Sequence, residues 1–149
     1  MKKLIAFAAL AFCSAYTVQA QVTYKVVTVV ESVVPMGLGR SRIIENKTDL
    51  DVKDFTTERT EGKDSKSKNV DRGDAKVDEF SESKILNFFS GVGINFQNIA
   101  SNDALISSKI NQLVAEGWEL AFVTSGVESD AGKGDGDGIY ITRFVFKKG

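Results

Sequence analysis

A dense run of β-branched residues near the start of the chain constrains the fold more than any other feature. Residues 22–34 read VTYKVVTVVESVV and stop at Pro35, the only proline, which cannot donate a hydrogen bond to a neighbouring strand. Valine and threonine favour the extended backbone, so the run predicts a long β-strand. Because valines fall on both faces at its centre, we expect an interior strand that is covered on both sides over its middle.

A helix is predicted in the last third of the chain. Ser101 or Asn102 can cap it, and it should end at Gly117, because glycine readily takes the left-handed conformation found there. The apolar residues of this segment recur at helical spacing on one stripe, which consists of Leu105, Ile106, Ile110, Leu113 and Val114.

Two strands should follow this helix. Residues 118–127 and 139–147 alternate with period two and predict a hairpin joined across residues 129–138. On the first strand, one face is expected to carry Trp118, Leu120 and Phe122.

The middle of the chain is rich in charge and poor in large apolar residues. We expect a mobile, solvated insertion at about residues 46–78, because such a segment buries too little apolar surface to offset its ordering entropy. Before it, residues 40–45 are predicted to form a short returning strand. After it, residues 78–89 are predicted to form a helix and residues 94–96 to be extended.

These elements predict an α+β fold. The N-terminal strand and the C-terminal hairpin should form a small, mainly antiparallel sheet, with one amphipathic helix packed on a face. Residues 21–149 would then make a single domain that carries the charged insertion as a mobile excursion.

The composition excludes several chemistries. The chain has 149 residues, no histidine and one cysteine, so a Ser-His-Asp triad, a histidine-ligated zinc site and a histidine general base are impossible on this chain alone. No cofactor motif is present, and no cofactor is expected. The formal net charge of −1 gives no electrostatic reason to bind nucleic acid.

The first 20 residues have the layout of a secretory signal peptide. Lys2 and Lys3 precede a short apolar run, and small residues end at Ala20. We therefore expect an exported protein, periplasmic or extracellular, with no transmembrane span in the mature chain. In the alternative interpretation Cys13 carries a lipid anchor, but Phe12 is bulkier than the small residue that normally precedes a lipidated cysteine.

Three motifs together resemble a small bacterial domain of unknown function. They are Tyr24-Lys25-Val26-Val27, then Ile110-Asn111-Gln112-Leu113 leading into Glu116-Gly117-Trp118-Glu119-Leu120, and finally Phe144-Val145-Phe146-Lys147-Lys148. The signature of that domain runs Y-K-V-V, L-x-x-E-G-W-E-L and F-x-F-K. The resemblance implies a strand, a helix and a hairpin that share one small sheet. It implies no activity, cofactor or catalytic residue.

One glycine-rich segment looks like a ligand-binding loop. Residues 129–138 read SDAGKGDGDG, and the carboxylates of Asp130, Asp135 and Asp137 are the oxygen ligands that calcium prefers. The spacing lacks the final glutamate of an EF-hand, and the segment lacks the residues of a phosphate-binding loop. We therefore expect a plain hairpin tip, with these three aspartates as the metal-ligand candidates.

Two arginines are the candidates for binding an anionic ligand. The guanidinium groups of Arg40 and Arg42 could hold a phosphate or a carboxylate. The interpretation that we favour places both on the solvent face of a short edge strand, where charge discourages sheet-to-sheet aggregation.

Three functions are compatible with these patterns. We favour an exported, non-catalytic interaction module that binds a protein or an envelope component, because the sequence holds no catalytic constellation. The second is a carboxylate-dependent hydrolase of sugar polymers, with Glu116 or Glu119 as the acid. The third is a self-assembling structural protein, a homo-oligomer that uses the unpaired edge of its sheet.

Overall fold

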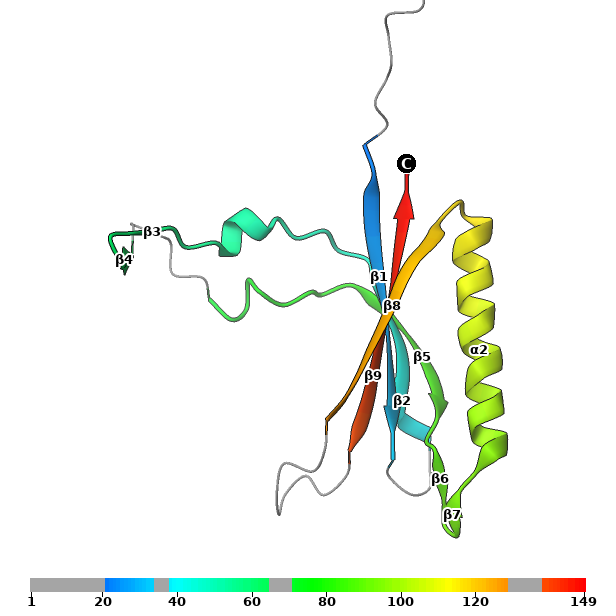
Figure 1. The fold of residues 1–149 in the computed structure, drawn as a ribbon. Helices are drawn as coiled ribbons and strands as arrows, with labels where there is room; N and C mark the ends of the chain where they lie inside the picture. The colour runs from blue at the N-terminus through cyan, green and yellow to red at the C-terminus, as the bar shows by residue number, and fades with distance from the viewer. Residues whose placement is uncertain (1–20, 34–37, 65–70, 129–137) are drawn as a thin grey trace, which may run out of the picture.

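An antiparallel sheet and one helix form the body of the protein. The computed structural model describes residues 21–33, 38–64, 71–128 and 138–149. The sheet has five strands in the order β5-β2-β1-β9-β8, and α2 lies along one of its faces (Figure 1). This arrangement confirms the predicted α+β class, with a mainly antiparallel sheet and an amphipathic helix on one face.

The elements have the following bounds. The strands of the sheet are β1 (Thr23–Ser32), β2 (Leu38–Asn46), β5 (Phe80–Leu86), β8 (Glu119–Glu128) and β9 (Ile139–Lys148). Two small hairpins consist of β3 (Arg59–Thr60) with β4 (Lys63–Asp64), and of β6 (Phe89–Ser90) with β7 (Gly93–Ile94). The helices are the short 3-10 helix η1 (Val52–Phe55) and α2 (Phe96–Ala115).

The β-branched run forms the central strand β1, as expected. It pairs with β2 on one side and, over its whole length, with β9 on the other. Val27 and Val29 on the helix side are buried, whereas Val26 on the opposite side is 45% exposed. The expectation that both faces are covered is therefore wrong for the described residues, because valines favour a strand whether or not a second layer lies above them.

The hydrophobic core fills the space between α2 and the sheet. Its buried members are Val27, Val29, Ile43, Ile85, Leu113 and Phe146, and Ile106, Ile110, Trp118 and Phe144 pack against them. Three residues of the predicted helix stripe thus face the core. Leu105 and Val114 are 45% and 53% exposed and lie outside the core.

The helix α2 begins earlier than the sequence indicates and ends as predicted. Asn95 caps it, and its side chain accepts hydrogen bonds from the backbone N–H groups of Gln97 and Asn98. Asn102, a predicted cap, instead lies buried within the helix. At the other end Gly117 has a φ of +88°, which is the left-handed conformation expected after the helix.

The helix predicted over residues 78–89 is wrong, because this stretch forms β5 and the start of β6. β5 pairs with β2, and Ile85 packs into the core. As a result β2 is an interior strand and not an edge strand, as the interpretation of Arg40 and Arg42 had assumed.

The C-terminal hairpin of β8 and β9 is confirmed, with one irregularity. Leu120 pairs with Phe146 and Phe122 pairs with Val145, so the register shifts by one residue between them. Such a bulge turns Phe122 to the face opposite Leu120. The prediction that these two residues share a face is therefore wrong.

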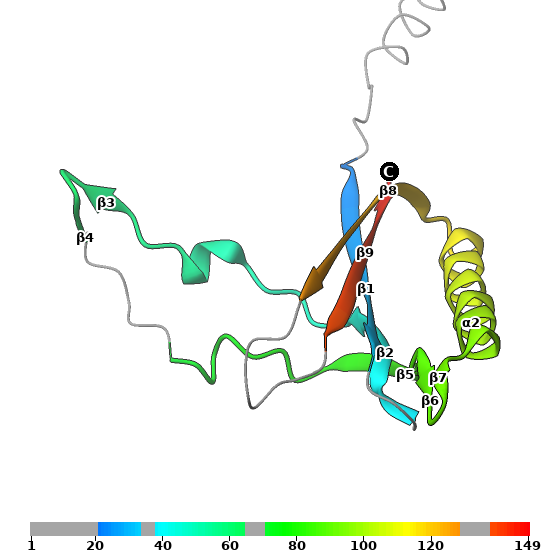
Figure 2. The ribbon, with the colours of Figure 1, turned by 60° about the horizontal axis from the view of Figure 1, so that its bottom comes forward.

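The charged insertion leaves and rejoins the sheet at one place. Asn46 at the end of β2 is the register partner of Phe80 at the start of β5. The described part of the insertion extends away from the sheet, on the side opposite α2 (Figure 1 and Figure 2). It contains η1 and the β3–β4 hairpin, and most of its described residues are exposed. Its mobility stays a prediction.

Two sets of predictions lie outside the described residues. They are the signal peptide at residues 1–20 with Cys13, and the hairpin tip with Asp130, Asp135 and Asp137. Within the described segments, none of the helices has the length and apolar character needed to cross a bilayer.

Candidate functional site

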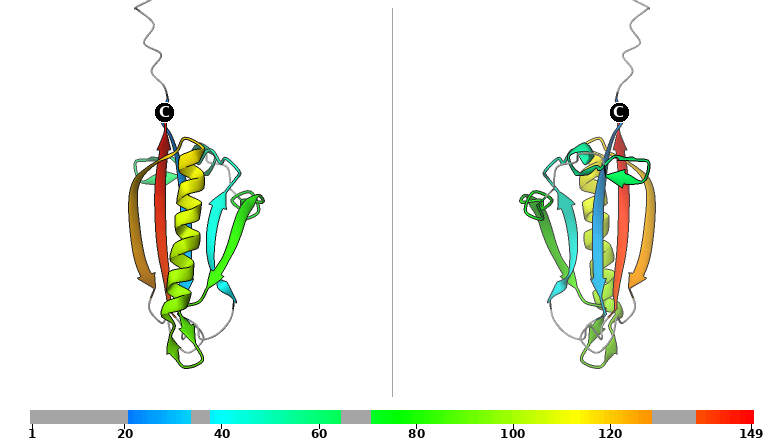
Figure 3. Two further views of the ribbon diagram at one scale, coloured as in Figure 1. Left: turned by 90° about the vertical axis from the view of Figure 1, so that its right-hand side faces the viewer. Right: turned by 90° about the vertical axis from the view of Figure 1, so that its left-hand side faces the viewer.

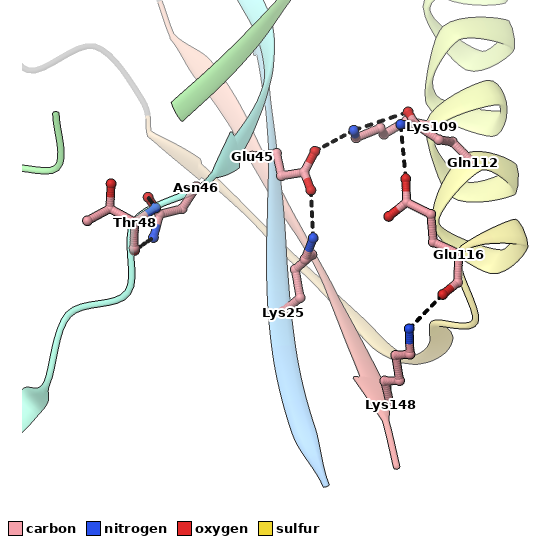
Figure 4. Close-up of polar contacts among 8 residues, drawn as sticks. All are labelled: Lys25, Glu45, Asn46, Thr48, Lys109, Gln112, Glu116 and Lys148. Atoms are coloured by element: carbon pink, nitrogen blue, oxygen red, sulfur yellow. Dashed lines mark hydrogen bonds and ion pairs between the residues drawn. The ribbon is translucent and has the colours of Figure 1, made fainter. Parts of the chain in front are cut away.

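A polar cleft of about 400 Å³ lies between the sheet and the C-terminal half of α2 (Figure 4). The side chains that line it come from β1, from the end of β2 with the residues that follow, and from the helix. They are Lys25, Glu45, Asn46, Lys47, Asp49, Gln112 and Glu116. Among these, the sequence analysis proposed only Glu116 as a site residue, because strand pairing and helix packing bring the others together without a local motif of their own.

Glu45 is the centre of this cleft. Its carboxylate accepts a hydrogen bond from Nζ of Lys25 at 2.8 Å and a second one from Nζ of Lys109. Its side chain is only 10% exposed. Burial by itself would raise the pKa of Glu45, but the hydrogen bonds and the positive charges of the two lysines outweigh burial and hold this pKa below its ordinary value.

A chain of polar contacts connects Glu45 to the end of the helix. Lys109 also donates to the side-chain oxygen of Gln112, and Gln112 donates to a carboxylate oxygen of Glu116 at 3.1 Å. Nζ of Lys148 donates to the backbone carbonyl of Glu116 at 2.8 Å (Figure 4). A cation at a helix C-terminus also interacts favourably with the helix dipole.

Trp118 lies beside this network. Nζ of Lys25 is 4.9 Å from the centre of its ring and Nζ of Lys148 is 5.8 Å from the same ring. Both distances allow a cation–π attraction. The indole therefore helps to hold two of the lysines in place while it packs against the core.

The network fits a structural role. A carboxylate that two ammonium groups keep ionised does not supply a proton at neutral pH, so Glu45 is a poor general acid. The ion pairs with Lys25 and Lys109 instead connect β1, β2 and α2 in one cluster.

A second polar cluster lies at the N-terminal half of α2. The side chain of Asn102 accepts a hydrogen bond from the backbone N–H of Leu86 at 2.8 Å and donates to its carbonyl at 2.7 Å. It also donates to the carboxylate of Glu31 at 3.1 Å. Burial raises the pKa of Glu31; the hydrogen bond from Asn102 opposes this shift and the charge of Asp103 adds to it.

The arginines named from the sequence lie on β2. The side chain of Arg40 is exposed, and Nε of Arg42 lies 3.4 Å from a carboxylate oxygen of Glu82 on β5. Arg42 therefore has an anionic partner within the sheet. Binding of an external anion by Arg40 and Arg42 stays a prediction.

The two glutamates of the hydrolase hypothesis line different cavities. Glu116 lines the polar cleft, whereas Glu119 lines a second cavity of about 310 Å³ together with Lys147 and Lys148. The carboxylate of Glu119 lies 3.4 Å from Nζ of Lys147. In the part of the chain that the structure describes, no group of three acidic or cysteine side chains is placed to hold a metal ion.

The face of the sheet opposite α2 is called the open face here. In the view of Figure 3 that faces this side, η1 and the β3–β4 hairpin of the insertion cross in front of one end of the sheet, and the described elements leave the rest of the face uncovered. The strand registers place these apolar residues on it: Tyr24, Val26, Val30, Ile44, Phe80, Phe122, Ile141 and Val145. Four of them are strongly exposed, namely Tyr24 (63%), Val26 (45%), Phe80 (48%) and Phe122 (56%).

Comparison of the chain with protein-family models, with curated proteins and with solved structures gave no significant match. The resemblance to a small bacterial domain of unknown function therefore stays a prediction.

Proposed function

We propose that the protein is a non-catalytic interaction module that binds another protein through the open face. The observation that carries this proposal is the exposure of Tyr24, Val26, Phe80 and Phe122 on one face of the sheet. Exposed apolar residues that share one surface are a typical mark of an interaction site.

The charges around the open face favour a protein as the partner. The same face carries Arg42, Glu82, Arg143 and Lys147, so charges of both signs lie among the apolar residues. Apolar residues mixed with charges of both signs suit the surface of another protein. An anionic membrane would favour a rim of basic residues only. The predicted signal peptide would place this partner in the cell envelope.

The polar cleft supports the same conclusion. Its central carboxylate, Glu45, is occupied by Lys25 and Lys109, and the carboxylate of Glu116 accepts a hydrogen bond from Gln112. These contacts connect the helix to the sheet, which is a structural role. The hydrolase hypothesis has a direct test: activity on sugar polymers that is lost in Glu116→Gln or Glu119→Gln would support it over the interaction module.

The proposal is tested by site-specific photocrosslinking in the native cell envelope. A photoreactive amino acid at position 24 or 26 should capture the same protein, whereas the same group at position 92 should not. Position 92 is the matched control, because Val92 is 99% exposed but lies in the β6–β7 turn.

The captured protein is then purified and its affinity for the chain is measured. The variants Tyr24→Thr and Val26→Thr keep the preference for a strand but remove apolar surface. Each should weaken binding at least about tenfold, as expected for a residue at the centre of an interface. Equal crosslinking at all three positions, or unchanged affinity in both variants, would refute the open face as the binding surface.

A further inference from the structure

The outer edge of β8 is long and unprotected. All ten residues of this strand are exposed, and in the described structure it pairs only with β9. Its sequence, ELAFVTSGVE, carries charge only at Glu119 and Glu128. Natural edge strands usually avoid such a surface, because their free N–H and C=O groups pair readily with another strand.

The opposite edge of the sheet is protected. β5 carries Glu82 and Lys84 in the middle of the strand. At the end of β5, the side chain of Asn102 forms hydrogen bonds with both the N–H and the carbonyl of Leu86, as a neighbouring strand would. The two edges of one sheet therefore differ, and only that of β8 is suited to accept a further strand.

We infer that two copies of this chain pair through β8, antiparallel about a twofold axis, and so form one continuous sheet of ten strands. This inference goes beyond the proposed function, because it concerns the edge of the sheet and a second copy of the chain. The open face and its partner are not required for it.

The bulge of β8 determines the register of this pairing. Regular pairing with β9 runs from Phe122 to Glu128, so the regular part of the edge is centred on Ser125. A twofold axis there places Ser125 opposite itself and Val123 opposite Val127 of the other copy. Val123 and Val127 are 48% and 62% exposed, so the pairing covers apolar surface that one chain leaves in water.

The charges of β8 do not oppose this register. Glu128 would face Phe122 of the second copy, and Glu119 lies beyond the regular part of the edge. No two carboxylates are therefore placed directly opposite each other. Like charges that face each other across two strands would destabilise the pairing, and this register avoids them.

The same geometry ends the assembly at two copies. After pairing, the free edges of the ten-stranded sheet are the two copies of β5, which Asn102 and the strand charges protect. Pairing of β8 with β5 of the next copy would instead propagate into filaments. A single pair of strands buries less surface than a standard interface, so the dimer should dissociate in the micromolar range.

The first test is the mass in solution as a function of concentration. The full chain of 16.2 kDa should pass from monomer to dimer over the micromolar range in sedimentation experiments. Ser125→Lys and Ser125→Asp should each remain monomeric, because two like charges then meet at the axis. An equimolar mixture of the two variants should restore the dimer, and Val92→Lys should dimerise like the parent chain.

The second test is disulfide crosslinking in a Cys13→Ser background, which contains no other cysteine. Ser125→Cys should crosslink to itself, and Val123→Cys should crosslink to Val127→Cys when the two proteins are mixed. Val92→Cys is the control and should stay monomeric.

Several results would overturn the inference. They are a parent chain that is monomeric at all concentrations, a dimer that Ser125→Lys leaves intact, filaments in place of a dimer, or a dimer without the two predicted crosslinks. If the dimer fails but the photocrosslinks at positions 24 and 26 are obtained, only the inference is lost. If the dimer forms and those crosslinks fail, the open-face proposal is lost.

Discussion

Glu45 shows how one side chain can hold the helix to the sheet. It lies on β2, and it accepts hydrogen bonds from Lys25 on β1 and from Lys109 on α2. Glu45→Gln removes the charge and leaves two half-buried ammonium groups with a weaker acceptor, so the variant should lose about 1 to 3 kcal/mol of unfolding free energy at pH 7.

The measurement is urea unfolding of both proteins as a function of pH. The pKa of Glu45 in the folded protein lies below the ordinary 4.5, so its stabilisation is complete above about pH 4.5 and is lost as the pH falls through the folded pKa. The difference in unfolding free energy between the parent chain and Glu45→Gln should therefore shrink as the pH falls below about 4.5. Glu119→Gln, at an exposed ion pair, is the control and should change stability by less than about 1 kcal/mol.

Glu31 should have the opposite effect. Burial raises its pKa, so its charged form costs stability above the folded pKa, and this cost disappears as the pH falls toward 4.5. Glu31→Gln removes the charge, and the amide oxygen can still accept the hydrogen bond from Asn102. The variant should have a higher melting temperature than the parent at pH 7 and an equal one near pH 4. A lower melting temperature at pH 7 would contradict this account.

At the scale of elements, Gly117 determines where α2 stops. A Cβ at this position would lie 3.5 Å from Cε of Lys148, an ordinary contact, so the cost of Gly117→Ala comes from the left-handed backbone. The variant should lose about 1 kcal/mol of unfolding free energy. Its circular dichroism spectrum should be the same as that of the parent chain, because the fold is unchanged. Gly126→Ala is the control, because Gly126 has open space and no positive φ. Equal losses of unfolding free energy in both variants would argue against the left-handed backbone of Gly117 as the cause.

The elements that could be predicted from the sequence are those with a strong period or a clear end signal. The valine run gave β1, alternating residues gave β8 and β9, and Gly117 gave the end of α2. The strand β5 was missed because its sequence, FSESKIL, has no clean alternation and is held by its pairing with β2. The bulge before Phe122 was missed because a register shift depends on the partner strand.

The candidate site was less predictable for the same reason. Glu45, Lys25 and Lys109 are far apart in the sequence, and only the pairing of β1 with β2 and the packing of α2 bring them together. No local motif marks such a cluster. The start of α2 was misplaced because Asn102 has the chemistry of a cap but uses its amide to bind the backbone of Leu86.

At the scale of the whole molecule, the insertion should be dispensable for folding. Replacement of residues 50–76 by a short Gly-Ser linker should change the unfolding free energy by no more than about 1 kcal/mol, because the entropy of closing a loop depends only weakly on its length. Urea unfolding provides the measurement.

In the parent chain, limited proteolysis should cut first between residues 49 and 76 and leave two fragments that stay associated. Early cuts within residues 105–120 would contradict the core described above.

The register pairing of Asn46 with Phe80 has a practical consequence. Because the insertion leaves the sheet and returns to it at adjacent positions, the fold requires only that its two ends stay close together. The sequence between those ends has little effect on the fold. An epitope tag, a protease site or a fluorescent reporter inserted between those two positions would leave the sheet and the helix intact. This position is therefore suitable for labelling the protein in its own cell.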